Sequence, residues 1–69
     1  MLVTDLGEAI KKRRKGLGIT QPHLSELAEI SINTLYKIER GQGNPSWEVV
    51  NKIAEVLGMI ICVQVKKKP

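Results

Sequence analysis

Two short helical segments joined by almost no connection constrain the fold of this chain most. Residues 21–28 and 32–40 carry apolar side chains at helical spacing, and only residues 29–31 lie between them. A turn this short forces two helices to cross steeply, and it requires small side chains where their backbones approach. Ser25 and Ala28 meet that need. We therefore expect the second helix to project one face from the surface.

Capping residues indicate where the helices begin. Thr20, Ser31 and Ser46 each precede a helical pattern, and their hydroxyl groups can accept a free N–H of the first turn. Asp5, followed by Glu8, has the spacing of a capping box that would begin the first helix. The predicted helices cover about 5–16, 21–28, 32–40 and the residues from Ser46 to a stop at Gly58.

The core of so short a chain must be a single small one. The sequence has 69 residues with few aromatic side chains, so leucine, isoleucine and valine must fill it. Such a core supplies only about 3–5 kcal/mol of net stability, so we expect help from a partner subunit. The residues of the last three helices predicted to face inward are Leu24, Leu27, Ala28, Leu35, Ile38, Val50, Ile53, Ala54 and Leu57.

After Gly58 the apolar spacing changes to a two-residue period, which predicts a strand over residues 59–66. Its apolar row consists of Met59, Ile61, Val63 and Val65. A solitary strand leaves backbone N–H and C=O groups unpaired, so we expect antiparallel pairing with the same segment of a second copy, giving a homodimer. The chain then divides into a helical domain, 1–58, and a dimerisation strand with a basic tail, 59–69.

Positive charge is concentrated in two runs. The net charge is +4, with five basic residues at 11–15 and three at 66–68, whereas the rest of the chain is net negative. This asymmetry favours local contact with a polyanion such as a nucleic acid, and a solvated helix face is the alternative for either run.

Several function classes are disfavoured by composition. The single Cys62 and single His23 cannot form an internal disulfide or a four-ligand zinc site, and their spacing does not suggest a nucleophile with its base. We therefore expect no metal, no cofactor and no enzyme activity. No stretch is long and apolar enough for a membrane span, and no signal peptide is evident, so we expect a cytoplasmic protein without a membrane partner.

The ordered set of residues resembles the lambda-repressor-like, Xre-type helix-turn-helix family of bacterial and phage repressors. The resemblance covers roughly residues 5–58 and implies a mainly α, compact domain of four to five helices. One departure is Glu29, which stands where the family usually has a turn glycine. Another is His23, which stands where an acidic or amide residue would complete a capping box with Thr20. The matching segments are Thr20-Gln21, Leu24, Ala28, Ile30-Ser31, Leu35, Ile38-Glu39-Arg40-Gly41, Asn44-Pro45-Ser46, Ile53-Ala54 and Leu57-Gly58.

The resemblance implies binding to double-stranded DNA through the major groove. Residues on the outward side of the third helix would contact base edges: Ile32, Asn33, Tyr36 and Lys37. For Tyr36, a phosphate contact or simple packing is an equal alternative. The implied phosphate contacts, which set register without reading sequence, are Gln21, Arg40, Gly41, Gln42, Gly43, Asn44 and Ser46. For Gly41 and Gly43, a role as turn glycines is an equal alternative. The implied structural ion pair joins Arg14 and Glu39, and Trp47 is interpreted as a partly buried packing residue.

We therefore predict a sequence-specific transcriptional regulator, acting as a homodimeric repressor of an inverted-repeat operator. The tail from Gly58 to Lys68 resembles the C-terminal strand of HipB-type antitoxins. The alternative hypothesis is accordingly an antitoxin that neutralises a toxin kinase by protein contact and represses its own operon.

Overall fold

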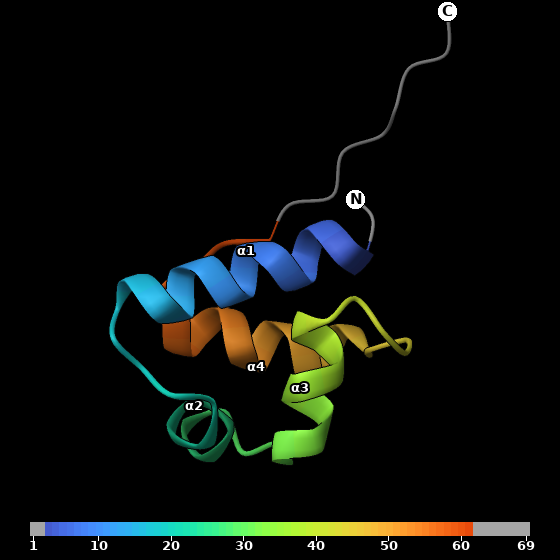
Figure 1. The fold of residues 1–69 in the computed structure, drawn as a ribbon. Helices are drawn as coiled ribbons and strands as arrows, with labels where there is room; N and C mark the ends of the chain where they lie inside the picture. The colour runs from blue at the N-terminus through green and yellow to red at the C-terminus, as the bar shows by residue number, and fades with distance from the viewer. Residues whose placement is uncertain (1–2, 62–69) are drawn as a thin grey trace, which may run out of the picture.

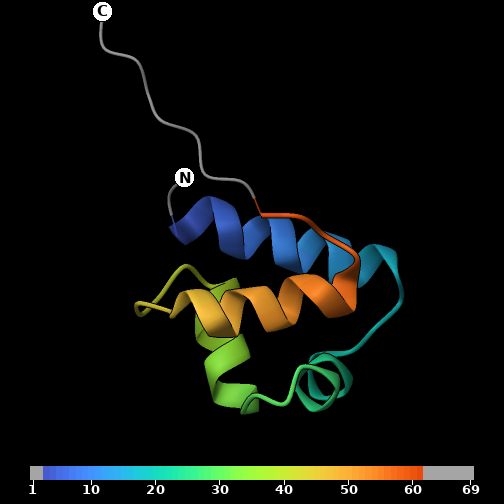
Figure 2. The same ribbon diagram turned by 180° about the vertical axis from the view of Figure 1, so that it is seen from behind.

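The computed structural model describes residues 3–61 and is mainly α, as predicted. Its four helices are α1 (Val3–Gly16), α2 (Gln21–Leu27), α3 (Ile32–Glu39) and α4 (Trp47–Leu57). α1 and α4 lie side by side, and α2 and α3 lie below them in Figure 1. The view from behind in Figure 2 shows the same arrangement, with the ends of α2 and α3 joined by their short turn.

The core forms where all four helices meet. Leu24, Leu35 and Ile53 are fully shielded from solvent, and Ile10 of α1 packs with them. Every residue predicted to face inward is buried except Leu27, whose side chain is 49% exposed. That prediction was wrong because Leu27 is the last residue of α2 and faces a hollow beside α4 instead of the core.

The three predicted hydroxyl caps are confirmed. In each case the residue before the helix has extended backbone, and its side-chain oxygen accepts an N–H from the first turn. The bonds run from the N–H of His23 to Thr20 (3.3 Å), of Thr34 to Ser31 (3.1 Å) and of Val49 to Ser46 (3.2 Å). These caps fix the starts of α2, α3 and α4.

The predicted beginning of the first helix was wrong. α1 already includes Val3, so Asp5 lies within the first turn and cannot be the cap. A carboxylate in this position is still favourable, because the first turn has the positive end of the helix dipole.

The turn between α2 and α3 contains the one non-glycine residue with positive φ among the described residues. Glu29 has φ 56°, which is left-handed backbone that favours glycine. The turn is closed by a 3.0 Å hydrogen bond from the Ile30 N–H to the Ser25 carbonyl. The departure from the usual glycine therefore leaves the turn geometry in place, at a local conformational cost.

Gly7 brings α1 against the end of α3. An added β-carbon at Gly7 would overlap the Ile38 carbonyl oxygen and lie 3.1 Å from the backbone of Glu39. The missing side chain therefore permits a close backbone approach, which sequence periodicity did not reveal. This contact helps to fix α3 on the domain.

The chain after α4 begins with a left-handed cap. Gly58 has φ 67°, and the Met59 N–H donates to the Ala54 carbonyl at 2.9 Å while its side chain packs against the core. No strand is present in residues 59–61, so the predicted strand does not begin at Met59, which is held by this cap. Val63 and Val65 lie outside the described residues.

Candidate nucleic-acid interface

The outward face of α3 is an exposed row of mixed chemistry. Leu35 and Ile38 anchor the opposite face in the core, and this anchoring turns the side chains between them and before them on the other face away from the domain, whereas Glu39 at the helix end is buried. Ile32 and Tyr36 are 44% and 47% exposed, and Asn33 and Lys37 are also exposed. The four residues predicted to contact bases therefore share one accessible surface.

Tyr36 and Arg40 form a contact one helical turn apart. Nη1 of Arg40 donates to the Tyr36 hydroxyl at 2.8 Å, and the guanidinium carbon lies 5.0 Å from the ring centroid. Sequence reasoning named both residues but missed the pair. The spacing of i and i+4 on one helix face is the signal that could have indicated it.

The loop between α3 and α4 presents backbone and short side chains to solvent. Gly41 and Gly43 have φ 71° and 76°, so both use the left-handed conformation. The loop folds back on α3 through a 2.8 Å bond from the Gln42 N–H to the Lys37 carbonyl. A hollow of about 210 Å³ lies between the loop and α3, and Asn44 is one of its lining residues. Ser46 is exposed at the end of the loop, with its hydroxyl used as the α4 cap.

A buried polar cluster lies behind this face. Arg14 and Glu39 are only 8% and 6% exposed, and their side chains form two hydrogen bonds of 2.7 and 2.9 Å. Arg14 also donates to the Ile19 carbonyl at 3.0 Å. Nε2 of Gln21, the first residue of α2, donates to the same Glu39 carboxylate at 3.1 Å. The cluster thus connects α1, the start of α2 and the end of α3.

The basic run at 11–15 divides into two kinds of residue. Arg14 is buried in the ion pair, and Arg13 donates from Nε to the Leu57 carbonyl at 2.9 Å. Lys11, Lys12 and Lys15 are exposed on α1. The run is therefore partly structural, and its charge count overstates what it can offer to a polyanion.

Trp47 differs from its interpretation as a partly buried packing residue. It is 56% exposed at the first position of α4. The first buried residue of this helix is Val50, one turn later, so Trp47 extends beyond the core that the other helices cover.

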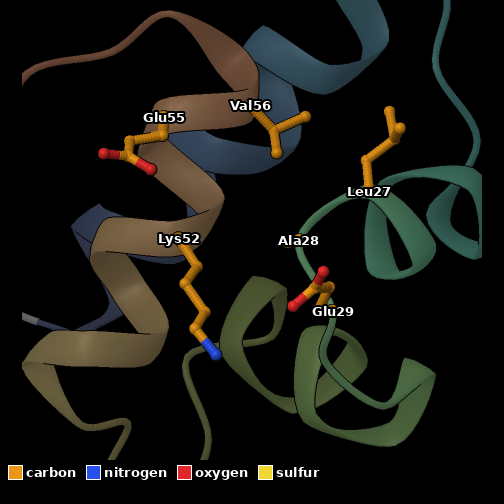
Figure 3. Close-up of a pocket in the computed structure, with 6 residues that line it drawn as sticks. All are labelled: Leu27, Ala28, Glu29, Lys52, Glu55 and Val56. Carbon is orange, nitrogen blue, oxygen red and sulfur yellow. The ribbon is translucent and has the colours of Figure 1, made fainter.

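A second hollow, of about 300 Å³, lies between the end of α2 and α4 (Figure 3). Leu27 and Val56 lie at its upper edge in that view, and Glu29 and Lys52 lie lower.

Within residues 3–61 no group of three or more His, Cys, Asp or Glu side chains could hold a metal ion. No helix among the described residues is long and apolar enough to cross a membrane.

Comparison with known proteins places these features in a wider group. The family described as "Helix-turn-helix domain" matches residues 5–59. A protein of Methanococcus vannielii, named as an HTH-type transcriptional regulatory protein, is 43% identical over 51 residues, which are 74% of this chain and 16% of the relative. The chain thus spans about one sixth of that protein. An HTH-type transcriptional regulator of Methanothermobacter thermautotrophicus is 37% identical over 71% of each chain.

Solved structures show the same arrangement of helices. The restriction-modification controller protein C.AhdI from Aeromonas hydrophila has a TM-score of 0.79 at 26% identity, over 84% of this chain and 88% of that one. The clp gene regulator ClgR from Corynebacterium glutamicum has a TM-score of 0.80 at 30% identity, over 86% of this chain and 63% of that one.

Proposed function

The chain belongs to the helix-turn-helix family of transcriptional regulators, and from this membership we propose that it binds a specific DNA sequence as a homodimeric repressor. The family is one of DNA-binding regulators, not of enzymes. As a DNA-binding protein it would act in the cytoplasm, with an inverted-repeat operator as its target. The proposal concerns this chain and not the additional length of its Methanococcus relatives.

The exposed face of α3 is the observation that carries the proposal. A major groove accommodates an α-helix, and amide and ammonium groups there distinguish base pairs. Asn33 can pair with adenine through two hydrogen bonds, Lys37 can donate to guanine, and Ile32 can contact a thymine methyl group. All three are exposed, while the buried face of the same helix holds them in a fixed orientation.

Contacts with the phosphates of the DNA backbone would set the register of α3 in the groove. Gln21 stands at the start of α2, where the positive end of the helix dipole favours a phosphate, although Pro22 has no N–H and the His23 N–H is used by the Thr20 cap. Its amide donates one N–H to Glu39 and has a second N–H for a phosphate oxygen. The remaining proposed phosphate contacts are Arg40, Gly41, Gln42, Gly43, Asn44 and Ser46.

A twofold dimer would present two copies of α3 to half-sites about one DNA turn apart. We assign the dimer contact to the apolar row of the tail, now without Met59, whose side chain packs against its own core. The row then consists of Ile61, Val63 and Val65. The antitoxin alternative has no support from the relatives described above, and we do not propose it.

Selection of bound DNA from a random pool, at several salt concentrations, tests the proposal. Asn33→Ala or Lys37→Ala should cost about 1–3 kcal/mol on the selected site and relax base preference at one position of each half-site. Lys52→Ala on α4 is the matched control, since it removes the same charge at the hollow beside α2. An unchanged selected sequence in both α3 variants, or no sequence preference in the unaltered chain, would contradict the proposal.

A further inference from the structure

Tyr36 and Arg40 are both exposed, yet a hydrogen bond and a cation–π contact join their side chains. We infer that these two residues together bind one DNA phosphate, so that Tyr36 contacts the DNA backbone and does not read a base. The inference rests on the proposed function and refines it by giving Tyr36 one of its alternative roles.

The hydrogen-bond direction supports this assignment. The Tyr36 oxygen accepts from Nη1 of Arg40 at 2.8 Å, so the phenol hydrogen is available for another acceptor. The guanidinium has five N–H donors in a planar fork, of which this bond uses one. The phenol O–H and the remaining guanidinium N–H groups therefore lie close enough to reach two oxygens of the same phosphate.

The ring also orders the arginine before DNA arrives. The guanidinium lies over the Tyr36 ring, 5.0 Å from its centroid, and this cation–π contact adds to the hydrogen bond. A long arginine side chain loses rotamer freedom on binding, and prior ordering lowers that loss. Tyr36 thus acts both as a donor and as a support for Arg40.

The position of Arg40, just after the end of α3, agrees with a contact to the DNA backbone. In helix-turn-helix proteins the residues near the start of the recognition helix reach base edges. Ile32 and Asn33 occupy that start, whereas Arg40 follows the last residue of the helix and precedes the glycine loop. Tyr36 bonds to Arg40, where the loop begins, so its hydroxyl is directed along the surface toward the proposed phosphate contacts.

The two donors should have different salt signatures. A charged arginine releases counterions when it binds a phosphate, but a neutral phenol does not. Arg40→Ala should therefore reduce the magnitude of the slope of log affinity against log salt concentration by about one, which is the contribution of one charge–phosphate contact. Tyr36→Phe should leave that slope unchanged while lowering affinity.

The experiment measures binding of the full chain to the selected operator and to a scrambled duplex across a salt series. Tyr36→Phe retains the ring, so its fold is preserved, and thermal melting checks this. We expect roughly tenfold weaker binding to both duplexes, with the same selected sequence. In the double variant with Arg40→Ala, the loss should be smaller than the product of the single losses, since both residues bind one phosphate.

Three results would overturn the inference. A changed selected sequence for Tyr36→Phe would make Tyr36 a base reader, and unchanged affinity would reduce it to packing. Independent losses in the double variant would place the residues on different groups. If the unaltered chain prefers its selected operator, these failures concern only the inference; if it shows no preference, the proposed function fails as well.

Discussion

Arg14 and Glu39, 25 residues apart in the sequence, form a two-point ion pair in the interior of the domain. Nε lies 2.7 Å from Oε2, with the two side chains only 9% and 2% exposed. The pair joins α1 to the end of α3, and its carboxylate also accepts from Gln21. The helix proposed to enter the groove is therefore fixed to the domain by charge as well as by apolar packing.

Removing one partner of the Arg14–Glu39 ion pair should strongly destabilise the domain. Arg14→Ala leaves the Glu39 carboxylate buried without its cation, at a cost of about 3–5 kcal/mol. A core of this size supplies a net stability of similar magnitude, so the variant should be largely unfolded at room temperature. Circular dichroism and thermal melting measure the effect.

The matched control replaces both charges. Arg14→Met combined with Glu39→Leu removes the ion pair while keeping apolar volume, and it should restore much of the helical signal. A single Arg14→Ala variant that melts within a few degrees of the unaltered chain would show that the pair contributes little to folding.

Gly7→Ala should destabilise the domain by about 1–3 kcal/mol, because the new methyl group would overlap the Ile38 carbonyl and push α1 from α3. Gly16→Ala is the control on the same helix, since nothing lies within 4 Å of its β-position. There the better helix propensity of alanine should raise stability by up to about 1 kcal/mol. Equal effects of the two substitutions, measured by urea unfolding, would contradict the close approach.

Glu29→Gly should raise the free energy of unfolding by up to about 1 kcal/mol, because glycine adopts the observed φ of 56° without steric cost. The same change at Glu26, an exposed position inside α2, should lower it by about 1 kcal/mol. Urea titrations of both variants make the comparison. A loss of stability at Glu29 similar to that at Glu26 would mean that the left-handed turn carries no strain.

The helices and most of the core could be predicted because they depend on local patterns. Ser31 caps α3 through a neighbour three residues away, and Leu35 and Ile38 mark the buried side by their spacing. The end of α2 was harder: Leu27 fits the apolar period, yet no helix covers it. Burial at a helix end depends on the position of other elements, which a local period does not contain.

For the candidate site, sequence spacing identified the outward face of α3, and the family resemblance implied the Arg14–Glu39 pair behind it, but neither gave the burial of that pair or its bond to Gln21. The burial of Arg14 and the bond from Gln21 to Glu39 require three segments to meet, and the close approach at Gly7 is equally non-local. The Tyr36 and Arg40 contact is local, and the i, i+4 rule was sufficient to suggest it.

The proposed dimer predicts that the tail determines the oligomeric state. Truncation after Ile61 keeps the Gly58 cap and the Met59 packing, so the helices should remain folded. It removes Val63 and Val65, which lie outside the described residues, and with them most of the proposed apolar row. Sedimentation equilibrium should then give a dimer for the full chain and a monomer for the truncated one. Operator binding should be weaker, because the two copies of α3 that contact the two half-sites are no longer linked.

Substitutions on one face of the expected strand distinguish the contribution of the apolar row to dimerisation from that of the rest of the tail. Val63→Lys with Val65→Lys should abolish the dimer, whereas Gln64→Lys, on the opposite face of the expected strand, should preserve it because successive side chains alternate. A monomeric full chain would refute the dimer itself. A truncated chain that remains dimeric would transfer the interface to the helices, where the half-exposed Leu27 at the hollow beside α4 is the apolar side chain to mutate next.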